Sequence, residues 1–167
     1  MSQYDFLFDH HIVPAFVPVA DAFSGGLTTE AVSLENYRKA TLVVLTGAIE
    51  GANSNLVTIE ASDDASGSNT TAMAFRYRAQ QYSTTVDTWG SLTAATSSGY
   101  NFASNNAVAN AVWFAEVLAE EVEAAQAGAA FVRAVIAETA DKTCTAGGLW
   151  ILSGPRYMQS VPLTAIA

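Results

Sequence analysis

The chain has 167 residues, of which 50% are hydrophobic and only 14% charged, and its formal net charge is −9. Ordinary soluble domains carry roughly 25% charged residues, so this surface is easier to desolvate than most and we expect other subunits to cover part of it. Because Lys39 and Lys142 are the only lysines, the chain has no basic footprint that could displace counterions, which argues against nucleic acid and anionic membrane as partners.

The single cysteine and the N-terminal residues indicate where the chain is made. Cys144 stands alone, which excludes an intramolecular disulfide and a cysteine-based metal site and fits a reducing compartment. The N-terminus, MSQYDFLFDHH, is acidic where a signal peptide would be basic, and no apolar run reaches membrane-spanning length. We therefore expect synthesis in a cytoplasm without an export signal.

Residues 1–27 are expected to form an extended N-terminal arm. Pro14 and Pro18 interrupt an apolar stretch, and their fixed φ and missing N–H donors disfavour both a helix and a central strand. The arm must be buried somewhere, either against its own domain or on a neighbouring subunit.

The regular part of the chain is expected to begin at Thr28. TTEAVSL predicts a weak strand, residues 35–37 a turn, and ATLVVLTGA a second strand. In this second run Leu42 and Val44 alternate with Val43 and Leu45, and no polar residue marks a solvent face. The pattern predicts a central strand that is buried on both faces.

Two further strands are expected before residue 83. In LVTIEAS the alternation predicts that Val57, Ile59 and Ala61 face the core. A polar loop over residues 63–69 then leads to AMAFRYRAQQY, where Arg76 and Arg78 alternate with apolar residues. This pattern predicts one strand with a wet or interfacial face.

The second half of the chain is more ambiguous. Residues 83–106 predict a loop that holds a short strand near residues 89–94, anchored by Trp89. Helix propensity alone would place two helices in the alanine-rich stretch 107–140, but WFAEV and FVRAVIA alternate in the manner of strands. We therefore expect a strand, a short helical turn over residues 119–126 and another strand, followed by a last strand at LWILS that ends at Gly154-Pro155.

These elements together predict an all-β protein, a β-sandwich of jelly-roll-like type with an extended N-terminal arm and at most one short helix. The expected organisation is an arm over residues 1–27, a sandwich domain over 28–158 and an apolar C-terminal tail over 159–167.

The polar residues do not form a convincing catalytic or metal-binding pattern. His10 and His11 have only Asp5 and Asp9 as nearby ligands, and no nucleophile elbow is present. Residues 63–69 resemble a calcium loop only loosely, and the glycine-rich pieces lack the lysine of a phosphate loop. We expect no catalysis, no cofactor and no metal.

The acidic patch of the chain has a simpler interpretation as a solvated or arginine-pairing face than as a glycosidase site, because residues so close on one turn rarely span a cleft. The patch comprises Glu116, Glu120, Glu121 and Glu123, and its natural mates are Arg76, Arg78, Arg133 and Arg156.

The order of these pieces resembles a known family. VPVADAF, VSLENYRKATLVVLTGAIEG, LVTIEASDD, AFRYR, DTWG, FVRAVI and GPRY, which together span roughly residues 15–158, are similar to the auxiliary capsid proteins of tailed bacteriophages, also called decoration, cement or head-stabilising proteins. The resemblance implies a non-enzymatic β-sandwich that assembles on the exterior of a capsid, often as a trimer, and binds the major capsid protein.

The sequence is therefore compatible with three functions. The first is a capsid decoration protein that acts as a homo-oligomer, and the second is a tail or head-to-tail connector component of a virion. The third is a carbohydrate-binding β-sandwich that uses exposed tryptophans among Trp89, Trp113 and Trp150. For the first, the expected interface residues lie in the arm, on the arginine-bearing strand and near the C-terminus: Val13, Pro14, Phe16, Val17, Pro18, Arg76, Arg78, Arg156 and Tyr157.

Overall fold

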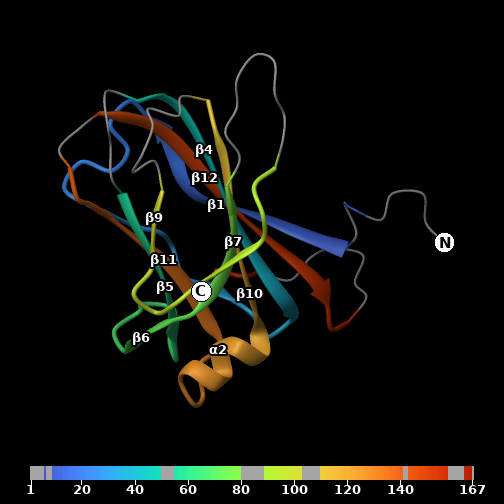
Figure 1. The fold of residues 1–167 in the computed structure, drawn as a ribbon. Helices are drawn as coiled ribbons and strands as arrows, with labels where there is room; N and C mark the ends of the chain where they lie inside the picture. Colours follow the sequence, from blue (N-terminus) through green and yellow to red (C-terminus); the bar gives the residue numbers. More distant parts are fainter. Residues whose placement is uncertain are drawn as a thin grey trace.

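The strands of the chain form two antiparallel sheets that lie face to face, which confirms the predicted all-β sandwich (Figure 1). The structure is a computed structural model that describes residues 6, 9–49, 55–79, 89–102, 110–140, 143–157 and 164–166.

The first sheet, sheet A, has the strand order β1-β12-β4-β10-β7-β8. Strand β4 lies between β12 and β10, so the run ATLVVLTGA is a central strand, as its pattern predicted. The strands of sheet A are β1 (His10–Val19), β4 (Tyr37–Ile49), β7 (Phe75–Ala79), β8 (Thr93–Ala95), β10 (Val112–Leu118) and β12 (Cys144–Pro155).

The second sheet, sheet B, has the order β2-β11-β5-β6, with β3 also paired to β11 and β9 also paired to β5. Its long members are β5 (Asn55–Ser62) and β11 (Phe131–Glu138), which confirms the two strands expected there. Its short members are β2 (Leu27–Thr28), β3 (Val32–Ser33), β6 (Thr70–Met73) and β9 (Tyr100–Phe102).

The core lies between the two sheets and follows the two-residue period of their strands. On β5 the residues Val57, Ile59 and Ala61 are fully buried, as the alternation predicted. Sheet A contributes the alternate residues of its central strands, among them Leu42 and Val44 of β4. Burial of these aliphatic and aromatic side chains is the main stabilising term for such a sandwich.

The arm segment that was expected to be extended contains the edge strand β1, which is hydrogen-bonded to β12 of the same chain. Proline is tolerated at such an edge because one side of the strand makes no ladder. Gly148 allows the close approach of β1, since a Cβ at this position would overlap the ring of Phe16. The division of the chain into arm, domain and tail stays a prediction, although β1 is part of sheet A.

The structure corrects three expectations about strands. AMAFRYRAQQY does not form one strand, because the chain passes from β6 of sheet B to β7 of sheet A at Ala74. TTEAVSL does not form one strand, since its first residue ends the two-residue strand β2 and Val32–Ser33 forms the separate strand β3. The stretch after Trp89 contains β8 and β9, of which β9 was not expected. The errors lie in how these segments divide into short strands and between the two sheets.

Helix α2 (Ala119–Ala125) confirms the short helical turn expected over residues 119–126. It closes one end of the sandwich, where it contacts strands of both sheets (Figure 1). Val122 on its inner side is fully buried. The Glu121 carboxylate accepts a hydrogen bond of 2.9 Å from the Leu118 backbone N–H, which satisfies one of the free donors at the start of the helix.

Candidate functional site

The two arginines that the sequence singled out lie on β7 and point away from the core. Arg76 and Arg78 are exposed, whereas Phe75 on the opposite side of the strand is buried. Arg76 Nη1 donates to Glu121 Oε1 at 2.8 Å, so this arginine pairs with the acidic patch, as expected. Arg78 forms no ion pair with any residue that the structure describes. It therefore leaves a cation available on this surface.

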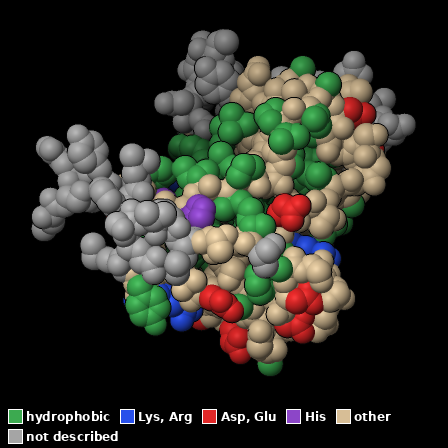
Figure 2. Space-filling model, turned by 180° about the vertical axis from the view of Figure 1, so that it is seen from behind, with side chains coloured by type: hydrophobic (Ala, Val, Ile, Leu, Met, Phe, Trp, Pro, Cys, Tyr) green, Lys and Arg blue, Asp and Glu red, His purple; other side chains and the backbone are tan. Residues whose placement is uncertain are grey.

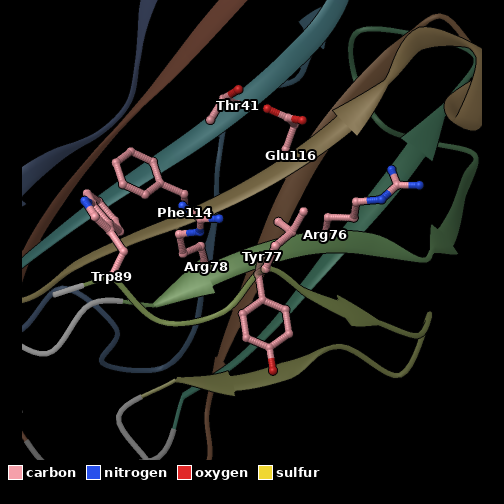
Figure 3. A pocket seen from close by; sticks show the side chains of 8 residues that line it. Thr41, Arg76, Tyr77, Arg78, Trp89, Phe114 and Glu116 are labelled. Carbon is pink, nitrogen blue, oxygen red and sulfur yellow. The ribbon is translucent and has the colours of Figure 1, made fainter.

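Beside these arginines lies a hollow of about 390 Å³ that we call the Trp89 hollow. Figure 3 shows the rings of Trp89 and Phe114 close together at one end of it; their centroids are 4.8 Å apart at a tilt of 40°. The residues that line it combine aromatic, aliphatic and charged side chains: Thr41, Arg76, Tyr77, Arg78, Trp89, Leu92, Phe114 and Glu116. Such a mixture suits recognition of protein surfaces, in which aromatic and arginine side chains are enriched.

Strand register brings these residues together from distant parts of the sequence. On β10, Phe114 lies opposite Arg78 and Glu116 lies opposite Arg76. Glu116 also lies opposite Thr41 of β4, and its carboxylate is 3.0 Å from Lys39 Nζ. The hollow is thus built on three adjacent strands of sheet A, with the segment before β8 lying over it.

The residues expected in the arm do not share one environment. Val13 is buried in the core, so it contributes to stability and is not part of the surface. Phe16 is partly buried, with its ring centroid 6.0 Å from that of Phe23. Pro14, Val17 and Pro18 are exposed, and they are the members of this group that a partner could contact.

Arg156 and Tyr157 lie in a different place, directly after the end of β12. Arg156 and Tyr157 line a second hollow of about 510 Å³ together with Arg38 and Glu120. The backbone N–H of Arg156 donates to the carbonyl of Asn36 at 2.9 Å, which fixes the chain at this end. The structure therefore separates the expected interface residues into two regions, one on sheet A and one near α2.

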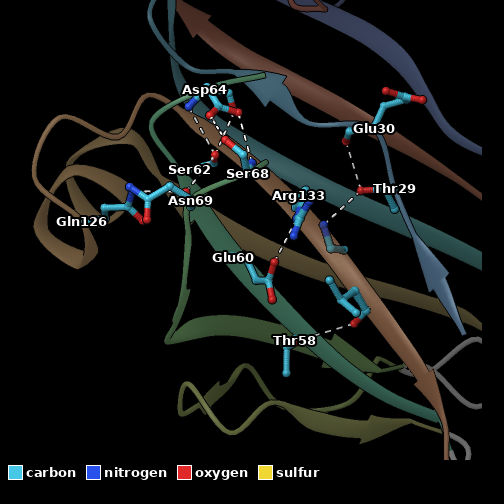
Figure 4. A network of polar contacts seen from close by, with 12 residues as sticks. Thr29, Glu30, Thr58, Glu60, Ser62, Asp64, Ser68, Asn69, Gln126 and Arg133 are labelled. Atoms are coloured by element: carbon cyan, nitrogen blue, oxygen red, sulfur yellow. Dashed lines mark hydrogen bonds and ion pairs between the residues drawn. The ribbon is translucent and has the colours of Figure 1, made fainter. Parts of the chain in front are cut away.

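The polar loop after β5 is held by its own side chains (Figure 4). Asp64 accepts hydrogen bonds from the hydroxyls of Ser66, at 2.6 Å, and of Ser68. These bonds hold the pKa of the Asp64 carboxyl well below its ordinary value of 3.8. Close by, Arg133 Nε donates to Glu60 Oε2 at 2.9 Å across β11 and β5. Because these side chains bind one another, they stabilise the loop and the outer face of sheet B.

Within the residues that the structure describes, no group of three or more histidine, cysteine or acidic side chains could hold a metal ion. His11 Nδ1 lies 3.0 Å from the hydroxyl of Tyr37, and His10 Nδ1 lies 2.9 Å from the carbonyl oxygen of Phe6. Among the described segments, no helix is long and apolar enough to cross a bilayer.

The tryptophans differ in exposure, and this bears on the expectation of a sugar site. Trp113 and Trp150 are core residues with 3% and 1% of their surface exposed. Trp89 is 42% exposed, so it is the one tryptophan that could stack on a ligand from solvent. The interpretation of Trp89 as a loop anchor is right only in that its ring lies against Phe114.

Sequence reasoning found the arginines of the Trp89 hollow but missed its apolar half. Leu92 and Phe114 come from separate segments, and only the register of β10 with β7 and β4 places Phe114 beside Arg78 and Val43. A usable signal was present in WFAEVL, since its outward positions include Phe114 as well as Glu116.

Comparison with known proteins gives one structural neighbour. No protein-family model matches the chain, and no curated protein matches it either. Among solved structures it is similar to the SPBc2 prophage-derived protein YomS, at 14% sequence identity and a TM-score of 0.44. The match covers 87% of this chain and 94% of that one.

Proposed function

We propose that this chain is a non-enzymatic structural protein of a bacteriophage virion, which binds the exterior of the capsid and stabilises it as a homo-oligomer, a trimer. The observation that carries the proposal is the exposed apolar surface of sheet A, which includes Ile12 of β1 and Leu45 of β4, 48% and 53% exposed. Large apolar patches on a soluble protein mark surfaces that bind other proteins. The resemblance of residues 15–158 to auxiliary capsid proteins supplies the class of assembly, a homo-oligomer that binds the major capsid protein.

The low charge of the chain supports the same function. A protein that clamps neighbouring capsid subunits needs broad surfaces that are easily desolvated, and only 14% of these residues are charged. The net charge of −9 suits a particle exterior, because like-charged particles repel one another and nucleic acid. On this proposal the protein is made in the host cytoplasm and acts without a cofactor.

A binding experiment with capsids tests the proposal. Particles of the phage that encodes this chain, assembled without it, are mixed with the purified protein and sedimented, and their thermal stability is then measured. The proposal predicts saturable binding to the particles and a higher disruption temperature. A protein that stays strictly monomeric in light scattering and does not sediment with the particles would contradict it.

A tail or head-to-tail connector component is a related alternative, because the same apolar surface could build a ring or tube. Labelling of the protein in electron micrographs of whole particles separates the two: label over the whole shell supports decoration, whereas label at one vertex or along the tail supports the alternative.

A carbohydrate-binding module is a weaker candidate, because Trp113 and Trp150 are in the core and leave Trp89 alone for stacking. Titration with sugars tests it through the fluorescence of Trp89. A protein fluorescence that does not change at millimolar concentrations of a broad sugar panel would eliminate it.

A further inference from the structure

The outer face of sheet A, meaning the face turned away from sheet B, carries a continuous apolar row. Strand register aligns it across five strands: Pro14 lies opposite Leu149, Leu149 opposite Val43, Val43 opposite Phe114, and Phe114 opposite Arg78. An antiparallel sheet that faces water usually carries polar residues there. In this row four of the five outward residues are apolar.

Exposure shows that neighbouring segments of the described chain leave much of this face uncovered. Leu45 of β4 is 53% exposed, and Leu92 beside the Trp89 hollow is 60% exposed. Of the nine large hydrophobic residues that are exposed in the described part of the chain, five lie in β1 up to Val17, in β4 or in the segment that covers the hollow: Ile12, Val17, Leu45, Trp89 and Leu92. Solvent contact at so many apolar side chains is unfavourable, and a partner that covers them would stabilise the assembly.

An outer face that binds a partner also explains why no polar residues alternate with the apolar ones in Leu42-Val43-Val44-Leu45. Leu42 and Val44 fill the core, while Val43 and Leu45 belong to the outer face. The sequence pattern predicted burial on both faces, and the chain buries Val43, which is 6% exposed, but leaves Leu45 53% exposed. A second protein layer against sheet A would cover Leu45.

The charges on this face indicate the sign of the charge that a protein layer bound to it should carry. Three cations, Lys39, Arg76 and Arg78, stand against two carboxylates, Glu116 and Glu121, so the face has one positive charge in excess. The whole chain has a net charge of −9, so the rest of it is more acidic still. A copy of this face would repel itself, whereas the acidic remainder of another copy complements it.

We propose that the outer face of sheet A binds a second copy of this chain in a head-to-tail contact, with the Trp89 hollow receiving an acidic surface of the neighbouring copy beside Arg78. The proposal rests on the homo-oligomer of the proposed function and names the face that forms it. Head-to-tail contacts use two different surfaces of each copy, and they close into rings when the rotation between copies permits. A trimer is one such ring.

The acidic partner surface has a candidate at the end of the sandwich near α2. Glu120 and Glu123 are both exposed there, and together with Glu35 they line a third hollow of about 470 Å³. Figure 2 shows the two kinds of surface on one side of the molecule, with hydrophobic side chains gathered in the upper part and acidic ones at the lower edge. A head-to-tail contact brings surfaces of these two kinds together.

Sedimentation velocity of the purified full chain over a range of concentrations tests the proposal. Leu45→Asp and Trp89→Ala should each raise the dissociation constant of the oligomer about tenfold or more, the effect expected at the centre of an interface. Thr28→Asp is the matched control, because Thr28 is exposed on β2 at the edge of sheet B and belongs to neither of the two contact surfaces. It should change the constant less than about twofold. Circular dichroism and thermal melting establish that each variant is folded.

A labelling measurement keeps the proposal testable if a variant folds poorly. Cys144 is fully buried, so a cysteine introduced on the surface is the one that reacts with a thiol reagent in the native protein. Leu92→Cys should be labelled more slowly as the concentration of protein rises through the dissociation constant. Thr28→Cys, on the edge of sheet B, should be labelled at one rate throughout.

The outcomes separate this inference from the proposed function. An oligomer that Leu45→Asp and Trp89→Ala leave intact, with no protection of Leu92→Cys, overturns the inference and leaves an oligomeric capsid protein standing. A monomer that still sediments with capsids overturns the inference and the homo-oligomer, and leaves capsid binding standing. A monomer that does not bind capsids overturns both.

Discussion

The Thr29 hydroxyl is a buried polar group that connects the two sheets. Its oxygen accepts hydrogen bonds from the Ala134 backbone N–H, at 3.0 Å, and from Trp150 Nε1, at 3.4 Å. It donates to the carbonyl of Glu30, as Figure 4 shows. Ala134 belongs to sheet B and Trp150 to sheet A. One hydroxyl therefore satisfies two buried donors, one in each sheet.

Replacement of this hydroxyl by a methyl group should be costly although the shape is kept. Thr29→Val leaves the two buried N–H groups without their acceptor, and we expect a loss of about 1–3 kcal/mol in the free energy of unfolding. Urea unfolding followed by tryptophan fluorescence measures it. Thr28→Val is the control, because Thr28 is exposed, and equal stability of the two variants would contradict this role of Thr29.

Cys144 gives a prediction about pH. Burial, with a smaller contribution from the charge of Asp21, raises the pKa of the Cys144 thiol from 9.0 to about 11. The folded thiol therefore keeps its proton at a pH where the unfolded thiol has lost it, so its contribution to stability is complete below about pH 8 and falls as the pH rises from 9 to 11.

The stability difference between the wild type and Cys144→Ala isolates this effect from other titrating groups. It should be constant from pH 6 to 8 and then shift by about 2 kcal/mol against the wild type by pH 11. Urea unfolding at each pH measures the difference. A difference that stays flat up to pH 11 would show that the thiol titrates normally in the folded protein.

At the scale of elements, α2 depends on Glu121, which caps the helix and also pairs with β7. Its carboxylate accepts from the Leu118 N–H at 2.9 Å and from Arg76 Nη1 at 2.8 Å. Loss of a helix cap costs about 1 kcal/mol, whereas an exposed ion pair contributes little. The helix cap is therefore the larger part of the contribution that Glu121 makes to the free energy of unfolding.

Glu121→Ala should lower the free energy of unfolding by about 1 kcal/mol, because the Leu118 N–H loses its acceptor. Glu120→Ala removes an exposed neighbour on the same turn and should leave stability nearly unchanged. Chemical denaturation of both variants measures the difference. If Arg76→Ala cost as much as Glu121→Ala, the ion pair and not the cap would be the source.

The contact between β1 and β12 depends on the absence of a side chain at Gly148. A Cβ there would overlap the ring of Phe16, so Gly148→Ala should cost about 1–3 kcal/mol through displacement of that ring. The same change in a Phe16→Ala background should cost clearly less, as a double-mutant cycle by thermal unfolding would show. Additive effects of the two substitutions would contradict the close approach.

The sequence was informative about long strands and much less about which sheet each one joins. Alternation in LVTIEAS and FVRAVIA identified β5 and β11, because one face of each is buried and the period is visible. The crossing between sheets at Ala74 was missed, because Met73 and Phe75 are both buried and the alternation continues through the crossing. Strand β9 is only three residues long, which is too short for a period to show.

The candidate surface was predicted in part for the same reason. Arg76 and Arg78 stood out within one strand, but Trp89, Leu92 and Phe114 meet them only through pairing between strands. The pairing of strands that are far apart in the sequence depends on the whole fold, so a local sequence pattern cannot predict it. The apolar outer positions of β4 were visible in the sequence, but which face they would occupy was not.

At the scale of the whole molecule, stability and function make opposite demands on sheet A. Its inner face supplies Trp113, Trp150 and Leu152 to the core, while its outer face leaves apolar side chains in solvent. The chain carries 16 acidic residues against 7 lysines and arginines, yet the hollow on this face is cationic. A role in holding other protein accounts for both features, since apolar contact supplies the affinity and charge selects the partner.

Quantitative mass spectrometry of gradient-purified virions, produced by the phage that encodes this chain, tests the central claim most directly. A structural protein of the capsid exterior should be present in a fixed ratio to the major capsid protein and should keep that ratio through repeated gradients. Absence of the chain from purified virions, or a ratio that falls with each gradient, would contradict the account.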